Sequence, residues 1–309
     1  MFEATDPAVA AGWTSPPARK GFFTDTSICI GCKACEVACK EWNEVPETPF
    51  EFLGSSYDNT GALGADTWRH VAFIEQRTPL RGDDGGAGQS PMQPPGDGAA
   101  SERDEHAGFF GDAGDFRWLM SSDVCKHCTS AACLDVCPTG SLFRTEFGTV
   151  VVQEDICNGC GYCVPACPFG VIDRRRGEPG VIKNAGLAQK CTLCYDRIGE
   201  GMEPACAKAC PTKSIQFGDL DVLRERAAER VDVLQQAGVA SAQLYGHDPS
   251  DGIGGAGAFF LLLDEPEVYG LPPNPVVTTR ELPTMWRSAS FAAGSLLLGA
   301  IVAFIGSSS

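Results

Sequence analysis

Sixteen cysteines are the residues of this sequence whose type and spacing could do chemistry. They fall into four runs of four, and none is left over: Cys29, Cys32, Cys35 and Cys39; Cys125, Cys128, Cys133 and Cys137; Cys157, Cys160, Cys163 and Cys167; Cys191, Cys194, Cys206 and Cys210. Such thiols could form disulfides, bind zinc or hold iron–sulfur clusters. Disulfides are disfavoured because closely spaced cysteines in one loop are poor bridge partners. The first 21 residues also lack the apolar stretch of an export signal.

The spacing of the runs separates zinc from iron–sulfur clusters. The first and third runs read C-x2-C-x2-C-x3-C, and proline follows Cys137, Cys167 and Cys210. A structural zinc ion usually takes two cysteine pairs, whereas three closely spaced thiolates suit one cubane, and the fourth thiol ligates the other cluster in two-cluster ferredoxins. The sequence therefore predicts four [4Fe–4S] clusters, with all sixteen cysteines as iron ligands.

The residues around the thiols must offset their negative charge. Small residues in the runs let the backbone approach sulfur and adopt positive φ: Gly31, Gly159 and Gly161. Five lysines could supply positive charge near the clusters, although exposed lysines that keep the loops soluble are the favoured interpretation: Lys33, Lys40, Lys126, Lys190 and Lys208. Since sixteen thiols already fill sixteen ligand positions, we expect His127 to lie beside the ligands or face solvent, without binding iron.

Composition excludes several classes of function. The 309 residues carry 24 Lys+Arg against 40 Asp+Glu, so the formal net charge of −16 disfavours nucleic-acid binding. Arg174–Arg176 is interpreted as a solvated turn, and Gly254–Gly257 as a turn before a strand. The sequence contains neither a G-x-G-x-x-G motif after a strand nor a P-loop, so no nucleotide site is predicted. No catalytic constellation is evident, and a chain of clusters moves electrons one at a time.

Hydrophobic patterning predicts the elements that position the cysteines. We expect a short helix over 35–42, strands over 71–74, 116–120, 148–153 and 258–263, and a packing helix between Asp219 and Gly238 whose apolar face includes Leu220 and Leu223. Residues 1–20 are predicted to be a disordered leader. Residues 79–115, rich in glycine and proline, are predicted to be a disordered insertion.

The last predicted element is a membrane helix. Ser288–Gly306 is nineteen residues without a charge, which as a helix spans about 28 Å, close to the hydrocarbon thickness of a bilayer. Trp286 and Arg287 lie where an interfacial anchor is expected. Ser295, Gly299 and Ala303 form a stripe of small residues suited to contact with another membrane helix. The alternative is a buried helix of a soluble protein, and we favour a single transmembrane helix over 286–306.

Four segments carry a resemblance to a known family: CIGCKACEVACKEWNE (29–44), DTWRHVAF (66–73), CNGCGYCVPACPFGV (157–171) and KCTLCYDRIGEGMEPACAKACPTKSI (190–215). They resemble the iron–sulfur (beta) subunit of membrane-bound formate dehydrogenase, in the molybdopterin-oxidoreductase four-cluster ferredoxin family. The tail, with GIGG at 252–255, VYGLP at 268–272 and one terminal membrane helix, is similar too. The insertion and the short stub after the helix depart from the family pattern.

The resemblance implies an α+β fold of two bacterial-ferredoxin-like modules and one C-terminal transmembrane helix. The outer module, 21–78 with 180–218, and the inner module, 116–179, would hold two clusters each; 219–285 would form a helix–strand extension. The implied ligand sets are Cys29, Cys32, Cys35 and Cys210 (set 1); Cys39, Cys191, Cys194 and Cys206 (set 2); Cys125, Cys128, Cys133 and Cys167 (set 3); and Cys137, Cys157, Cys160 and Cys163 (set 4).

The family also implies partners. A separate molybdenum or tungsten pterin catalytic (alpha) subunit would oxidise formate. Electrons would pass through this chain, which has no catalytic site of its own, to a cytochrome b-type membrane (gamma) subunit that reduces quinone. The globular part would lie on the outer face of the membrane by analogy, whereas Arg280 and Arg287 favour the cytoplasmic face. Two alternatives remain: the same role beside a nitrate, dimethyl sulfoxide or polysulfide reductase or a hydrogenase, and a metal-binding scaffold without redox traffic.

Overall fold

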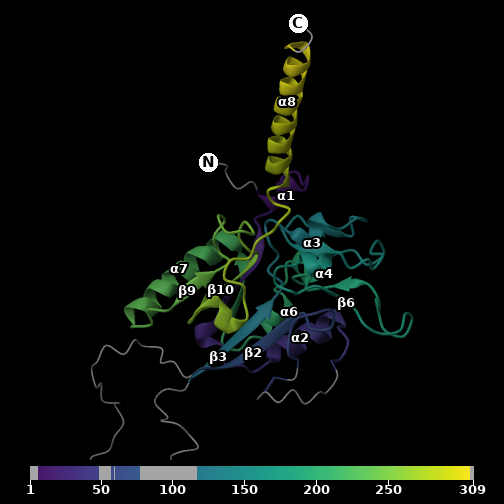
Figure 1. Cartoon of the computed structure of the whole chain (residues 1–309). Helices are drawn as coiled ribbons and strands as arrows, with labels where there is room; N and C mark the ends of the chain where they lie inside the picture. The colour runs from purple at the N-terminus through teal and green to yellow at the C-terminus, as the bar shows by residue number, and fades with distance from the viewer. Residues whose placement is uncertain (1–5, 49–56, 59, 77–116, 307–309) are drawn as a thin grey trace, which may run out of the picture.

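The computed structural model describes residues 6–48, 57–58, 60–76 and 117–306, and it mixes short strands with helices in an α+β fold. The predicted insertion at 79–115 lies outside the described residues, and so do residues 1–5 of the predicted leader. A globular body carries one long helix, α8 (Leu282–Gly306), which projects away from it (Figure 1).

A four-stranded sheet brings one strand from the N-terminal part of the chain between strands from its C-terminal part. Its order is β8 (Ile215–Asp219), β1 (Lys20–Asp25), β10 (Ala258–Leu262) and β9 (Gln243–Tyr245). Strand β1 runs parallel to β10 and antiparallel to β8. Side chains on both faces of the central strands are completely buried, as a strand covered on both sides requires: Phe22, Phe23, Phe259 and Phe260. Helix α7 (Leu220–Gln236) packs on this sheet through Leu220, Leu223 and Ala227.

Three two-stranded ribbons and five short helices hold the cysteine loops. The ribbons pair β2 (Arg69–Gln76) with β3 (Arg117–Val124), β4 (Leu142–Arg144) with β5 (Val150–Val152), and β6 (Asp173–Arg174) with β7 (Ala188–Gln189). The short helices are α2 (Ala34–Asn43), α3 (Ala132–Asp135), α4 (Cys163–Ala166), α5 (Tyr195–Gly199) and α6 (Ala205–Lys208). Two 3-10 turns, Thr26–Ile28 and Pro266–Tyr269, complete the described elements.

The prediction of a disordered leader is wrong for residues 6–20. Helix α1 (Pro7–Ala10) begins at Asp6, whose carboxylate accepts a hydrogen bond from the Ala8 amide at 2.8 Å. The Trp13 indole donates to the carbonyl of Arg144, 131 residues along the chain, at 2.9 Å. This segment is ordered by partners from distant parts of the sequence, which its composition could not reveal.

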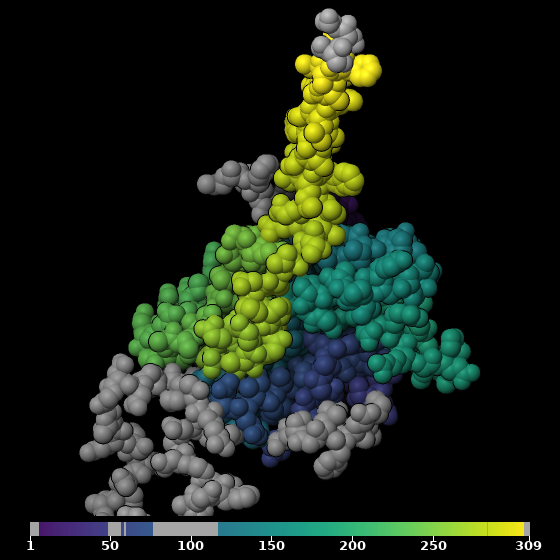
Figure 2. Space-filling model, in the orientation of Figure 1, coloured from purple at the N-terminus to yellow at the C-terminus, as the bar shows by residue number. Residues whose placement is uncertain are grey.

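Helix α8 differs from every other described helix in its surroundings. Its apolar side chains are exposed along its length, and Thr284–Ile305 is long and apolar enough to cross a membrane. Figure 2 shows this helix standing clear of the globular surface. A helix that is apolar all round and buried against nothing is typical of a membrane span, so the alternative of a buried soluble helix is disfavoured.

Candidate metal centre

The sixteen thiols are all free, and they differ in how deeply they lie in the protein. Half are buried, whereas Cys32 and Cys160 are exposed. The glycines predicted to let the backbone turn around the sulfurs do adopt positive φ, with values of 64° at Gly31 and 70° at Gly159. A Cβ at Gly159 would lie 2.5 Å from the carbonyl oxygen of Gly186, so no other residue fits there without backbone movement.

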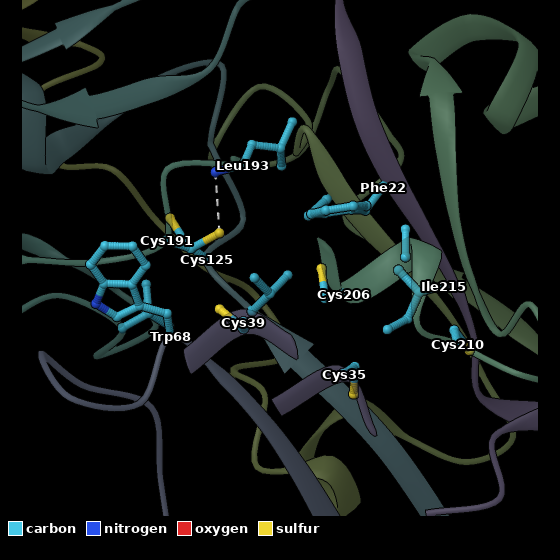
Figure 3. Close-up of a cluster of buried hydrophobic side chains, with 14 of the residues drawn as sticks. Phe22, Cys35, Cys39, Trp68, Cys125, Cys191, Leu193, Cys206, Cys210 and Ile215 are labelled. Carbon is cyan, nitrogen blue, oxygen red and sulfur yellow. Dashed lines mark hydrogen bonds between the residues drawn. The ribbon is translucent and has the colours of Figure 1, made fainter. Parts of the chain in front are cut away.

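One buried cavity is lined by the four cysteines of set 2, together with Phe22, Trp68 and Arg69. Helix α2 supplies Cys39, Cys194 precedes α5, and α6 supplies Cys206. Figure 3 shows Cys39, Cys191 and Cys206 around this space, with the Leu193 amide donating to the Cys191 sulfur at 3.3 Å. Burial raises the pKa of Cys39 well above its ordinary value, and the neighbouring Cys191, Cys206 and Cys194 raise it further.

A second cavity is lined by the four cysteines of set 3, with Lys126, His127 and Lys190 in the same wall. Burial raises the pKa of Cys128 well above its ordinary value, and repulsion from Cys125, Cys133 and Cys167 adds to the rise. Burial also raises the pKa of Cys133 to about 12, an effect that the Lys190 ammonium opposes. Four sulfurs thus share one apolar enclosure in which free thiolates would be poorly solvated.

The cysteines of sets 1 and 4 include the two exposed thiols, Cys32 and Cys160. Burial raises the pKa of Cys29, with smaller contributions from the thiols of Cys210 and Cys32. Burial raises the pKa of Cys163 to about 11, with contributions from Cys157, Cys160 and Cys137. Cys29 and Cys163 therefore each lie near other thiols of their own expected set.

Electrostatic interactions also reach from one set to the next. They join Cys35 to Cys206, Cys191 to Cys125, and Cys133 to Cys163. Some thiols of different expected sets therefore lie close enough to influence one another's pKa.

The thiol-lined cavities fit iron–sulfur clusters in donor type and in their unused hydrogen-bonding groups. Cysteine sulfur is the usual ligand of such clusters. Within the described residues, no three His, Cys, Asp or Glu side chains are grouped so that they could hold a single metal ion. A cubane differs from such a site because it binds each thiolate at a separate iron. The His127 ring accepts from the Val150 amide at Nδ1 (3.1 Å), so a neutral ring carries its proton on Nε2, which is buried and has no partner among the described residues.

Two predictions about charged residues need correction. Lys126 and Lys190 are each only 1% exposed, so the interpretation as solvating lysines is wrong for both. Arg175 is buried and donates to Asp66 at 2.9 Å, so only its neighbours in Arg174–Arg176 are solvated. Of the two places expected for His127, the structure favours the one beside the cysteines, since His127 is 2% exposed and lines the set 3 cavity. The sequence feature that could have indicated the burial of the two lysines is their position next to a cysteine: Lys126 follows Cys125, and Lys190 precedes Cys191.

Sequence reasoning missed Arg69 as a residue of the site. It lies in the wall of the set 2 cavity, at the start of β2, and donates from Nη2 to the sulfur of Cys206 at 3.4 Å. It occurs in a segment that carries the family resemblance but no cysteine, 30 positions after Cys39. The pairing of β2 with β3 places it opposite Val124, which lines the same cavity.

Comparisons with known proteins agree with this donor set. The 4Fe-4S dicluster domain family matches residues 28–141 and again residues 116–220. The iron–sulfur subunit of the nitrate-inducible formate dehydrogenase of Escherichia coli K12 is 35% identical over 269 residues, covering 86% of this chain and 76% of that protein. The formate dehydrogenase iron–sulfur subunit of Haemophilus influenzae is 34% identical over 290 residues, covering 91% and 78%.

A relative from a different enzyme matches a shorter region. One chain of the anaerobic dimethyl sulfoxide reductase of E. coli K12 is 33% identical over 211 residues, covering 67% of this chain and 76% of that protein. The longer matches extend through more of this chain, and the fold, the free thiols and the dicluster domains agree with them. The chain belongs to the family of ferredoxin-type iron–sulfur subunits of formate dehydrogenases.

Proposed function

We propose that this chain is the electron-transfer subunit of a formate dehydrogenase complex, with four [4Fe–4S] clusters. A separate molybdenum or tungsten pterin subunit would oxidise formate to carbon dioxide, releasing one proton and two electrons. A cytochrome b-type membrane subunit would pass the two electrons, with two protons, to quinone. The observation that carries the proposal is the convergence of distant cysteines on two enclosed cavities, one lined by Cys39, Cys191, Cys194 and Cys206 and the other by Cys125, Cys128, Cys133 and Cys167.

The four ligand sets expected from the family are proposed as the iron ligands. When bound, a [4Fe–4S] cluster supplies a centre that takes up and releases one electron at a time. The chain's own contribution is to hold thiolates in walls that exclude water and to place cations beside them. The apolar side chains around set 2 include Phe22 and Trp68, and those around set 3 include Val150 and Ile172. These walls lower the local dielectric and so strengthen the effect of each buried charge.

The domain boundaries and the placement in the complex are also proposed. The outer module (21–78 and 180–218) would face the catalytic subunit, and the inner module (116–179) would face the membrane. The exposure of Cys32 in set 1 and of Cys160 in set 4 supports this, because each leaves one set of its module accessible from the surface. Helix α8 would anchor the chain as a single membrane pass, with the globular part on the outer face by family analogy.

Electron paramagnetic resonance on the complex, purified anaerobically from detergent-solubilised native membranes, tests the function. We expect formate to produce reduced-cluster signals that integrate to more than one spin per chain. If dithionite reduces the clusters but formate does not, the proposed substrate is wrong and the electron-transfer role stands. If neither donor produces a signal, the electron-transfer role itself is wrong.

The same role in another molybdoenzyme is the second candidate, favoured by the match to the dimethyl sulfoxide reductase relative. That enzyme would draw electrons out of the chain, so its substrate would oxidise clusters that dithionite had reduced. Adding dimethyl sulfoxide to the dithionite-reduced complex distinguishes the two, because a formate dehydrogenase complex keeps its signals.

A further inference from the structure

Arg69 is a completely buried guanidinium that lies between two cysteine sets. It is 1% exposed, and its guanidinium carbon lies 4.9 Å from the centroid of the Phe22 ring. Nη2 donates to the Cys206 sulfur of set 2 at 3.4 Å, and Nη1 donates to the backbone carbonyl of Ser122 at 3.0 Å. One end of this cation therefore touches a proposed iron ligand.

Ser122 connects the other end of the guanidinium to a different set. Its hydroxyl lies 3.4 Å from Nη1 of Arg69 and 3.2 Å from the sulfur of Cys35, which belongs to set 1. Ser122 is held in place by β3, which pairs with β2 so that Val71 lies opposite Ser122. A continuous line of polar contacts thus runs from Cys35 through Ser122 and Arg69 to Cys206.

The charge of Arg69 has no carboxylate to balance it among the described residues. Its hydrogen-bond partners there are the Cys206 sulfur and the Ser122 carbonyl and hydroxyl, and its Nε is buried without a partner in the same part of the chain. A buried cation left without an opposite charge is strongly destabilising. The sulfurs that would supply the opposite charge are those of Cys206, in direct contact with Nη2, and of Cys35, reached through the Ser122 hydroxyl.

We propose that Arg69 raises the reduction potentials of the two clusters held by sets 1 and 2, and that it does so unequally. Reduction of either cluster adds one electron and one negative charge to the sulfur-rich group. A fixed positive charge and a hydrogen bond to a ligand sulfur both favour that reduced state. Set 2 receives the direct hydrogen bond and set 1 receives one relayed by Ser122, so the larger effect falls on set 2. This inference rests on the proposed ligand sets.

Potentiometric titrations of the intact complex, followed by electron paramagnetic resonance, test the role of Arg69. Arg69→Gln removes the charge at similar size, and Arg69→Lys keeps the charge but loses the forked donor geometry. We expect Arg69→Gln to make reduction of one cluster at least tenfold less favourable, which lowers its potential by about 59 mV for a one-electron couple. The potential of a second cluster should fall by a smaller amount. The cluster potentials of Arg69→Lys should lie between those of Arg69→Gln and those of the unaltered protein.

Arg175→Gln is the matched control. Arg175 is also buried and donates to Asp66, to the carbonyl of Lys183 at 3.0 Å and to that of Ala65 at 3.1 Å, so its partners within the described residues are oxygens. Its loss should weaken packing without moving any cluster potential. Equal shifts in Arg69→Gln and Arg175→Gln, or no shift in Arg69→Gln at full iron content, would overturn the proposal.

Ser122→Ala keeps the test decisive if Arg69→Gln fails to bind its full iron. It deletes one hydroxyl and leaves the guanidinium in place, so we expect a lower potential for a single cluster and an unchanged iron content. An unchanged set of potentials in both Ser122→Ala and Arg69→Lys would overturn the relay. Dithionite serves as the reductant in these titrations, so the potentials can be measured even if formate proves not to be the substrate.

Discussion

At the scale of single residues, the structure separates cysteines that are neighbours in sequence. Cys35 and Cys39 lie one turn apart on helix α2 and both are buried, yet Cys39 lines the cavity of set 2 and Cys35 does not. Cys35 instead contacts the hydroxyl of Ser122. This difference agrees with the proposal that the two thiols, four residues apart on one helix, bind different clusters.

This division predicts how pairs of cysteine substitutions combine. Cys39 and Cys191 belong to one proposed set, so we expect the double variant Cys39→Ser/Cys191→Ser to lose the iron of one cluster. Cys35 and Cys39 belong to one sequence run but to two proposed sets, so the double variant Cys35→Ser/Cys39→Ser should lose the iron of two clusters. Iron analysis and spin integration on the purified complex measure both. Equal losses in the two double variants would contradict the proposed sets.

The sequence predicts which cysteines lie close together better than it predicts which other residues are buried around them. Cysteine spacing indicates ligands because three thiols on one tight loop must converge locally. The burial of Lys126, Lys190 and Arg69 depends on which strands and loops cover them, and sequence position alone does not record this. Lys190, for example, is fixed by the carbonyl of Val150, which reaches it only because β5 lies beside this loop.

At the scale of elements, the ribbon of β2 and β3 has a register that bears on the long segment between them. The pairs run without interruption from Arg69 opposite Val124 to Gln76 opposite Arg117. The two residues that flank segment 77–116 are thus directly opposite each other at the end of the ribbon. A two-residue turn closes such a pair of antiparallel strands.

We therefore predict that replacing residues 77–116 with Asn-Gly leaves the fold and the iron content unchanged. The polar line through Ser122 lies at the opposite half of the ribbon from Gln76, so the cluster potentials should also stay within error. Iron analysis and the thermal unfolding midpoint of the purified complex measure this. Loss of iron would mean that the segment supports a cluster; loss of the catalytic subunit alone would assign the segment to that interface.

Most individual elements could be predicted from their patterning. The expected helix over 35–42 is α2, and the expected strands over 71–74 and 258–263 correspond to β2 and β10. The central sheet could not be assembled in advance, because β1 pairs in parallel with a strand more than 230 residues further along. Close approach makes this pairing possible: a Cβ at Gly21 would lie 2.2 Å from the carbonyl oxygen of Gly257. A glycine requirement of this kind is visible only once the partner strand is known.

At the scale of the whole molecule, the segment before α8 is tied to the globular body, whereas the apolar side chains of α8 are exposed. The carbonyl of Asp251 accepts from Arg280, and the carboxylate of Asp135 accepts from the Thr279 hydroxyl. Beyond this point the helix exposes large apolar side chains such as Phe291 (79%) and Phe304 (78%). A fully buried side chain of this type contributes about 1.5–3 kcal/mol, so a bilayer would stabilise the helix strongly, whereas the body would lose little without it.

A chain that ends at Glu281 should therefore keep its fold and iron while leaving the membrane. Expressed without partner subunits, it should appear in the soluble fraction after membranes are pelleted, and the full chain should require detergent. Replacing 282–306 with a leucine–alanine helix of equal length is the control, since hydropathy alone should return the chain to the membrane.

In the complete complex the same control also tests the stripe of Ser295, Gly299 and Ala303, because close contact with a partner helix needs small side chains. Retention of the cytochrome subunit by the control would show that the helix serves only as an anchor, and its loss would assign the stripe to subunit contact. A truncated chain that still pellets with membranes would contradict the anchor itself.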